Sequence, residues 1–292
     1  MLRAYVRDDH GGLKIHDEVE TGGAVAELTD GRGVLYPTKL PSFHRAPAHE
    51  DIDAWIRWFW VPRWELPPGR TSRQTVLPFP ASNLVVQSDS VRLHGPTTGV
   101  SHQDLRGRGW AVGASLRPAG IASLHADPHG IKNSAVVFDA PELHTTVTAA
   151  MHHPDKATGR EYAIAAFTAW AAERFSAPDA EGMLANEMEH LISADRTIVR
   201  IDQVATHLGV SVRAVQRLAR RYVGLPPLAI IRRYRLQEAA QRLREDPSLT
   251  IAQVSAELGY ADHAHLAADF RTVLGLAPSV YRRDSAKATE QT

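Results

Sequence analysis

The chain has 292 residues, no cysteine, and 33 basic against 33 acidic side chains. The lack of cysteine excludes disulfide bonds, thiolate metal sites and cysteine nucleophiles, and the length predicts about two domains. No apolar run near Met1 resembles a signal peptide, and the longest apolar stretch, residues 163–172, is too short to span a bilayer. We therefore expect a cytoplasmic protein with no membrane partner.

The balanced charge hides an asymmetry along the chain. From Ile192 onward there are 15 basic and 10 acidic residues, against 18 and 23 in the part before it. A basic half of this kind is typical of proteins that bind a polyanion. Chance clustering produces offsets of the same size, so charge alone leaves both interpretations open.

Residues 1–155 predict a β-rich domain. Apolar residues alternate with small or polar ones between Gly109 and Pro118, which is the period of a strand with one apolar face. Residues 83–87 and 91–94 are short runs that predict a hairpin, and residues 55–60 predict another strand. Several short strands at this spacing favour a small barrel or a sandwich.

Residues 156–192 predict a helical connector. Its first helix places Ala163, Phe167 and Ala171 on one face, and a turn at residues 176–179 separates it from a second helix. Residues 193–285 form an expected all-helical C-terminal domain, and residues 286–292 form an expected disordered tail. The predicted fold class is thus α+β and multidomain.

The C-terminal block contains an internal repeat. Residues 201–209 are echoed by residues 251–259, with Ile, Gln, Val, Leu and Gly recurring 50 positions later. The similarity continues with one inserted residue, so that Arg220 matches Arg271. Such self-similarity indicates one supersecondary unit used twice.

The pattern of each repeat predicts a helix, a tight turn and a second helix. In the first repeat Gly209 suits the left-handed end of a helix, and Ser211 suits the N-cap of the next. The second helix is expected to bury an apolar face. That face consists of Val215, Leu218, Ala219 and Tyr222.

The opposite face of this second helix carries Arg213, Gln216, Arg217 and Arg220, at the spacing of helical neighbours. In the major groove, an arginine side chain can form two hydrogen bonds to the edge of guanine, and a glutamine side chain can form two to the edge of adenine. No acidic residue lies between Asp202 and Glu238, whereas seven arginines do. A solvated charged face is the alternative, but the glycine turn, the cap and the duplication favour contact with DNA.

These residues resemble the DNA-binding domain of the AraC/XylS family over about residues 201–283. The motifs that carry the resemblance are residues 208–217, Gly224–Pro227, Arg232–Leu236, Leu258–Asp262, Phe270-Arg271 and Gly275–Arg282. The resemblance implies a double helix-turn-helix in which Arg213, Gln216 and Arg217 face bases. Ala219 departs from the family, which usually has a bulky aromatic residue there.

The second unit has a different face from the first. Ala264, Ala267 and Ala268 align with Arg213, Gln216 and Arg217, and alanine donates no hydrogen bond to a base. We therefore expect base reading mainly by the first unit and contact with the DNA backbone elsewhere. The expected backbone or mixed contacts are Ser211, Arg220, Arg221, His263, His265 and Arg271.

A long helix is expected to join the two units. Residues 226–244 begin with two prolines and place Leu236, Ala239, Ala240 and Leu243 on one face. A helix of about 18 residues spans about 27 Å. Successive major-groove sites on one face of DNA lie about 34 Å apart, so one chain could occupy two of them.

The segment from Leu35 to Pro118 is similar to the small, cupin-like β-barrel of some AraC-type regulators. This resemblance rests on Phe43–Arg45, Leu77–Leu84, Gly95-Pro96 and residues 109–118. It implies a ligand pocket or a protein contact surface. A small-molecule effector and a homodimer formed through this domain are the corresponding partner predictions.

Other patterns in the front half have two interpretations. Gly107, Gly109 and Gly113 resemble a dinucleotide loop, but an alternating strand follows instead of a helix. His125 and His129 have the spacing of metal ligands, yet Pro128 lies between them, which favours a loop. The aromatic group of Trp55, Trp58, Phe59, Trp60 and Trp64 favours core over ligand cavity, with an apolar ligand cavity lined by some of them as the alternative.

The sequence therefore predicts a sequence-specific DNA-binding transcription regulator, with no catalytic residues, no metal and no cofactor. Its operator is double-stranded DNA. One alternative is a cupin-like metal enzyme fused to a DNA-binding module, which needs a cluster of histidines and a carboxylate. Another is an architectural DNA binder without sequence preference, which the alanine face of the second unit favours.

Overall fold

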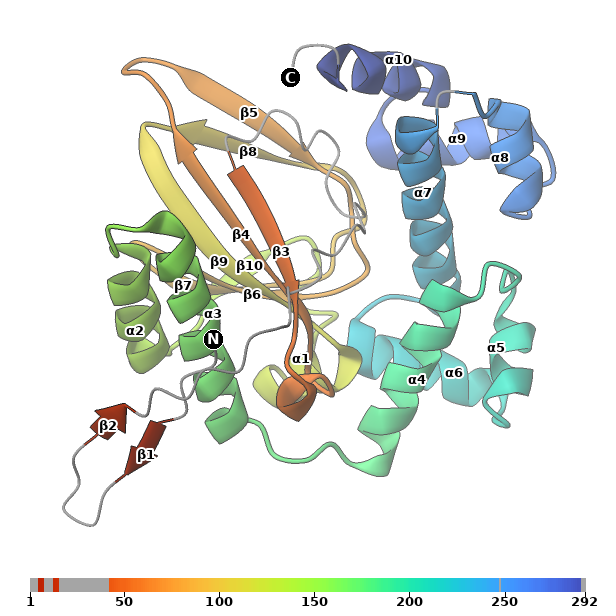
Figure 1. Cartoon of the computed structure of the whole chain (residues 1–292). Coiled ribbons are helices and arrows are strands. Elements are labelled where there is room, and N and C mark those ends of the chain that lie inside the picture. Colours follow the sequence, from red (N-terminus) through yellow and green to blue (C-terminus); the bar gives the residue numbers. More distant parts are fainter. Residues whose placement is uncertain (1–4, 8–12, 16–41, 247, 290–292) are drawn as a thin grey trace.

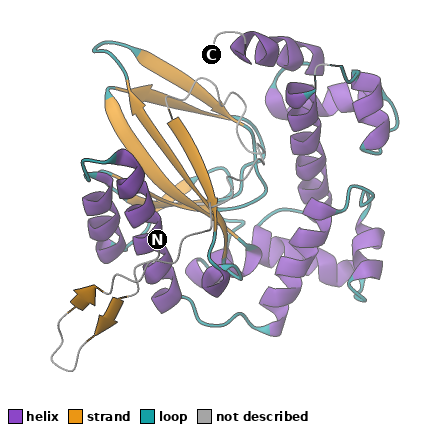
Figure 2. Ribbon diagram, viewed as in Figure 1, coloured by secondary structure: helices purple, strands orange, loops and turns teal. Residues whose placement is uncertain are grey.

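The computed structural model describes residues 5–7, 13–15, 42–246 and 248–289. Most strands lie in one half of the molecule, and the C-terminal helices make up the other half (Figures 1 and 2). A short antiparallel pair, β1 (Tyr5–Arg7) and β2 (Leu13–Ile15), precedes them. Within the described residues no helix combines the length and apolar character that a membrane crossing requires. The part of the cupin-like resemblance at residues 35–41 lies outside the described residues.

The front domain is built on a six-stranded antiparallel sheet. Its strands are β3 (Ser42–Pro47), β4 (Ile56–Glu65), β6 (Asn83–Gln87), β7 (Val91–His94), β9 (Arg108–Leu116) and β10 (Ala135–Val137). They lie in the order β10-β7-β6-β9-β4-β3. The predicted hairpin at residues 83–94 and the strands at residues 55–60 and 109–118 are thereby confirmed. The turn η2 (Glu50–Ile52) lies between β3 and β4.

The expected closed barrel is not present in the described part of the chain, and the cupin-like likeness is not confirmed. β5 (Thr71–Val76) and β8 (Ser101–Arg106) pair only with each other, as a separate two-stranded sheet. Prolines flank β5 on both sides, at residues 67, 68, 78 and 80. Proline cannot donate a ladder hydrogen bond, so the chain leaves the large sheet before β5 and does not close it.

The two faces of the large sheet have different coverings. Phe59 is fully buried and packs edge to face on Phe167, with ring centroids 5.4 Å apart. This face lies under α2 (Pro141–Met151) and α3 (Lys156–Arg174). From Ala111 to Leu116 along β9 the residues of both faces are buried, and on the face opposite the helices Ala111 and Ser115 line a cavity whose other wall includes residues of β5 and β8. The sequence pattern predicts only one of these apolar faces.

The predicted connector divides between two cores. Ala163, Phe167 and Ala171 of α3 belong to the front core, as their helical spacing predicts. α4 (Ala180–Ala194) instead packs Ala185 and Met188 into the first helix-turn-helix unit. α1 (Pro118–Leu124) follows β9 and contacts α4.

The C-terminal half is helical throughout. It contains α5 (Ile201–His207), α6 (Val212–Leu218), the π-helical turn η3 (Ala219–Val223), α7 (Pro227–Glu245), α8 (Ile251–Glu257), α9 (His263–Leu274) and α10 (Pro278–Thr289). α7 buries Ile230 in the core of the first unit and Leu243 in that of the second. Figure 1 shows α7 standing between them. α10 extends through residues 286–289, which the sequence analysis assigns to a disordered tail, and residues 290–292 lie outside the described residues.

Candidate nucleic-acid interface

The first unit has the geometry that its sequence predicts. Gly209 has a φ of +63°, in the left-handed region where a Cβ is strained, and so turns the chain sharply after α5. The Ser211 hydroxyl accepts a hydrogen bond of 3.2 Å from the Ala214 backbone N–H and caps α6. The turn and the cap fix the direction in which α6 leaves α5.

α6 and η3 present one apolar and one basic face. Val215, Leu218 and Ala219 are at most 1% exposed. The side chains predicted to contact DNA lie on the exposed face, namely Arg213, Gln216, Arg217, Arg220 and Arg221. Ala219 contributes to the packing because the front domain comes close here: α1 lies against η3, and Ala122 packs on the same core.

An acidic residue from α4 engages this basic face, which sequence reasoning missed. The carboxylate of Glu181 lies 3.5 Å from Nε of Arg217 through one oxygen and pairs with Arg221 through the other. Glu181 comes 36 residues before Arg217, and no local pattern joins them. In this conformation Arg217 and Arg221 share one carboxylate partner.

The second unit repeats the turn with a different surface. Gly259 has a φ of +67°, and the Asp262 carboxylate caps α9 by accepting a 2.7 Å hydrogen bond from the His265 N–H. Ala264 and Ala268 are exposed where the first unit has Arg213 and Arg217. Of the predicted backbone contacts, Arg271, His263 and His265 are all exposed, and the His265 ring meets Tyr260 edge to face at 5.2 Å.

The repeated glutamines are capping residues. The Gln203 side-chain oxygen accepts bonds of 2.9 Å from the backbone N–H groups of Val199 and Arg200 at the start of α5. Gln253 accepts a 2.9 Å bond from the Thr250 N–H at the start of α8. Each glutamine satisfies helix-terminal donors that lack a partner within the helix. The sequence shows that these glutamines recur 50 residues apart, and the contacts show that their shared role is capping.

The acid-free stretch of seven arginines does not form a single DNA surface. Arg232 is exposed, whereas Arg233 donates to the Thr98 carbonyl of the front domain. Arg235 donates to the Leu258 carbonyl at 2.8 Å and lies over the Tyr260 ring. Burial lowers the pKa of both Arg233 and Arg235. Two of the seven arginines, Arg233 and Arg235, thus form hydrogen bonds within the protein.

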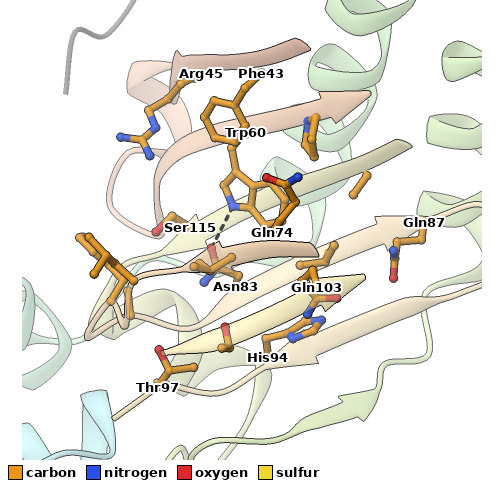
Figure 3. Close-up of a pocket in the computed structure, with 18 of the residues that line it drawn as sticks. Phe43, Arg45, Trp60, Gln74, Asn83, Gln87, His94, Thr97, Gln103 and Ser115 are labelled. Atoms are coloured by element: carbon orange, nitrogen blue, oxygen red, sulfur yellow. Dashed lines mark hydrogen bonds between the residues drawn. The ribbon is translucent and has the colours of Figure 1, made fainter. Parts of the chain in front are cut away.

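A cavity of about 270 Å³ lies between the large sheet and the β5–β8 pair. Trp58, Trp60 and Trp64 line it, so three members of the aromatic group that was expected in the core face the cavity instead. Phe59 remains in the core, because neighbouring residues of a strand point to opposite sides. In Figure 3 the Trp60 ring projects among Gln74, Asn83, His94 and Gln103.

Glycines on β9 make room for these indoles. Trp60 is paired with Gly113, and Trp64 with Gly109, across the β4–β9 ladder. A Cβ on Gly113 would lie 2.1 Å from the Trp60 ring, and one on Gly109 would lie 2.2 Å from the Trp64 ring. Both rings therefore lie directly against the β9 backbone. Two of the three glycines that resemble a dinucleotide loop, Gly109 and Gly113, have this packing role, whereas Gly107 lies at a positive φ of +53° with open space around it.

A buried polar cluster joins the cavity wall to the DNA-binding half. Arg57 of β4 forms an ion pair with Glu189 of α4, whose side chain is 2% exposed, and donates a 3.0 Å bond to the Tyr234 hydroxyl of α7. Phe79, which lines the cavity, meets Tyr234 edge to face at 5.4 Å. The Gln237 amide of α7 donates to the Pro78 carbonyl at 2.8 Å. α7 therefore contacts the segment that forms one wall of the cavity.

The histidine pair with metal-ligand spacing makes ordinary hydrogen bonds. His125 Nδ1 accepts from the Asp127 backbone N–H at 3.2 Å, and His129 Nδ1 donates to the Gly224 carbonyl at 2.9 Å. In the described residues no three histidine, aspartate or glutamate side chains gather as metal ligands would. The metal-enzyme alternative gains no support from this geometry.

Two family matches divide the chain as the fold does. Residues 204–284 match a family described as a helix-turn-helix domain, and residues 44–136 match a domain of unknown function (DUF6597). The C-terminal half is therefore a helix-turn-helix module, a class of fold that binds duplex DNA.

The curated relatives specify the type of module. An 82-residue stretch is 33% identical to the HTH-type transcriptional activator AarP of Providencia stuartii, covering 28% of this chain and 60% of that protein. A 116-residue stretch is 29% identical to a putative AraC-like transcription regulator of Streptomyces antibioticus, covering 37% of this chain and 38% of that one. In this module the chain is similar to parts of these transcription regulators. It spans about 60% or less of the length of these relatives.

Solved structures give more distant similarities. ToxT from Vibrio cholerae is 12% identical, with a TM-score of 0.42 over 77% of this chain and 96% of ToxT. An AraC-type regulator from Chromobacterium violaceum is 27% identical, with a TM-score of 0.34 over 36% of this chain and 93% of that one.

Proposed function

We propose that the whole chain is a sequence-specific, double-stranded-DNA-binding transcription regulator that acts in the cytoplasm and catalyses no reaction. One observation carries the proposal: α6 exposes Arg213, Gln216 and Arg217 on a glycine turn. A capped helix that projects arginine and glutamine from such a turn matches the donors and acceptors of base edges in the major groove.

The two units have unequal roles in this proposal. Arg213, Gln216 and Arg217 read bases, while Ser211, Arg220 and Arg221 bind the adjacent backbone. In the second unit Arg271, with His263 and His265, binds phosphates, because the exposed alanines of α9 supply no hydrogen bonds to bases. The first unit therefore determines which sequence is chosen, and the second adds affinity.

α7 sets the separation of the two reading helices. Its 19 residues span about 28 Å at about 1.5 Å each. Successive major-groove sites on one face of DNA are about 34 Å apart. The length of α7 is therefore of the order needed for one chain to contact two successive grooves.

Selection of binding sites from random duplex DNA tests this proposal. The full chain should enrich one motif, whereas Arg213→Ala/Arg217→Ala should bind DNA at low salt without enriching it. Lys132→Ala, on an exposed loop of the front domain, is the control and should enrich the same motif as the wild type. DNA binding with no enriched motif in the wild type would favour the architectural alternative, which the alanine face of α9 supports. No binding at low salt would overturn both.

The front domain supplies regulation in this proposal. A small molecule in the cavity would press on Trp58 and Phe79, and Phe79 contacts Tyr234 of α7. An effector changes DNA affinity only if it binds two arrangements of the chain unequally. Homodimerisation through the front domain remains a prediction, which sedimentation analysis with and without effector would check.

A further inference from the structure

The cavity wall contains a row of uncharged polar groups across neighbouring strands. Ser115 on β9 is paired with Asn83 on β6, and Asn83 is paired with His94 on β7. All three line the cavity. Adjacent strands are about 4.8 Å apart, so the row is about 10 Å wide, which is close to the width of one ring with its substituents. We refer to Ser115, Asn83 and His94 as the polar row.

The polar row has unused hydrogen-bonding groups. Within the described residues, neither the Ser115 hydroxyl nor the His94 ring has a hydrogen-bond partner, although Ser115 is only 1% exposed. Asn83, which also lines the cavity, uses its oxygen to accept a 3.0 Å bond from Trp60 Nε1 (Figure 3), and its amide N–H groups have no hydrogen-bond partner among the described residues. Buried polar groups normally find partners, so the row is suited to a ligand that supplies them.

The Trp60 indole provides a fixed apolar surface beside this row. One side of its ring lies against Gly113, and its Nε1 is held by Asn83, so the ring cannot turn freely. Such an indole offers a face on which an apolar ring surface stacks. The ligand is therefore expected to combine one apolar face with a polar edge.

The charges around the cavity restrict the ligand further. Its described lining contains no aspartate or glutamate, so a buried cation would lack a partner. Arg45 is the one arginine of that lining, and its guanidinium lies over the Trp58 ring at 4.8 Å, beyond one end of the row. Burial lowers the pKa of His94, with a smaller contribution from Arg92, which keeps this member of the row neutral.

We propose that the cavity binds a small, uncharged ring-shaped molecule, with its apolar face on Trp60 and its polar edge on Ser115, Asn83 and His94. The inference rests on the proposed function only in treating the cavity as the effector site. The volume of about 270 Å³ is near the lower end for ligand pockets, which are typically about 300–1,000 Å³. A single ring with a few substituents suits this space.

Four probes test the proposal on the full chain. Benzamide, benzoate and benzylamine have nearly the same size and differ in charge, and glucose is an uncharged saturated ring. Saturation-transfer NMR and calorimetry should give benzamide or glucose a Kd on the order of 1 mM, at least about tenfold tighter than the two charged probes. A preference for glucose or benzamide distinguishes a saturated from a planar ligand.

Variants link the binding to this site. Trp60→Leu should abolish binding of the preferred probe, and Ser115→Ala should weaken it about two- to tenfold, the effect of one hydrogen bond. Ser123→Ala is the matched control, because the Ser123 hydroxyl bonds only within α1, to the Ala119 carbonyl at 2.9 Å. Circular dichroism checks that each variant is folded, and the small Ser115→Ala change keeps the test valid if Trp60→Leu does not fold.

Several results would overturn this inference. They are a tighter fit for benzoate or benzylamine, no binding of any probe, or binding that Ser115→Ala leaves unchanged. The enriched DNA motif of the unliganded chain is measured separately and does not depend on these outcomes. If the uncharged probe binds but leaves DNA affinity unchanged, the ligand site stands and the regulatory part of the proposed function fails.

Discussion

The two helix-turn-helix units share a scaffold and differ in what they expose. Each begins at a glutamine cap, turns at a glycine of positive φ and buries an apolar face of its second helix. On this common frame α6 exposes arginine and glutamine, whereas α9 exposes alanine. The residues that make the fold and the residues that would read DNA are thus separate sets, and one set can change without the other.

The units also differ in their attachment to the front domain. The first is held by side chains, through α4 and the buried cluster of Arg57, Glu189 and Tyr234. The second has no such ion pair with the front domain among the described residues. Leu77 of the front domain packs into its apolar core, the Val100 N–H donates a 3.1 Å bond to the Val273 carbonyl, and Arg233 donates to the Thr98 carbonyl. The cavity wall therefore contacts both units, through Phe79 against Tyr234 and through Leu77 in the core of the second unit.

The largest expected effect concerns the buried ion pair of the first unit. Glu189→Gln removes one partner of a buried ion pair and leaves the Arg57 charge uncompensated, which should lower the free energy of unfolding by about 3 kcal/mol. Urea denaturation measures this loss, and hydrogen exchange should show the first unit loosening more than the second. Glu187→Gln, an exposed position of the same helix, should change stability by less than about 0.5 kcal/mol. Equal loosening of both units would contradict the difference in attachment.

The next largest effect is expected from variants that compare how the first and second units contribute to DNA sequence preference. Arg217→Ala should cost about 1–3 kcal/mol of affinity for the selected motif and relax sequence preference. Arg271→Ala should instead weaken binding to all sequences alike and reduce the salt dependence. Gel shifts on the selected motif and on scrambled DNA, at fixed salt, compare the two. Equal losses of selectivity would show that the units read DNA equally.

A smaller loss of stability is expected when the glutamine cap that both units share is removed. Gln203→Ala and Gln253→Ala each remove a helix cap and should each cost about 1 kcal/mol of stability. Gln203 should cost more, because its amide also donates a 3.0 Å bond to the Thr197 carbonyl. Thermal unfolding measures both, with Gln241→Ala on α7 as the control. A loss at only one glutamine would mean that the repeated caps are not equivalent.

The smallest effect concerns the contact between Glu181 and the first reading face. Glu181→Gln removes the ion pairs with Arg217 and Arg221, which are largely exposed and worth about 0.2–1 kcal/mol. Freed arginines should bind DNA about two- to fivefold more tightly at low salt. Glu187→Gln removes the same charge from α4 without releasing either arginine, and should have less effect. Weaker binding by Glu181→Gln would show that this contact positions α6 for DNA.

The sequence by itself determined the local architecture of the DNA-binding half. The turn at Gly209, the cap at Ser211 and the buried and exposed faces of α6 follow from interactions within four residues, which a helical period reports directly. Because the second repeat has the same pattern, the sequence also predicts the turn at Gly259 and the helix α9 that follows it. The strands at residues 83–87, 91–94 and 108–116 followed from their period of two.

Only the tertiary structure decided what covers each face. A period of two shows that β4 has two sides, but not that helices cover Phe59 while Trp60 lines a cavity. Whether the strands close into a barrel depends on pairing between distant segments, which no local pattern records. The contacts of Glu181 with Arg217, and of Arg57 with Glu189 and Tyr234, join residues far apart in the chain. Periodicity carries information over a few residues, whereas these contacts exist only once the whole chain has folded.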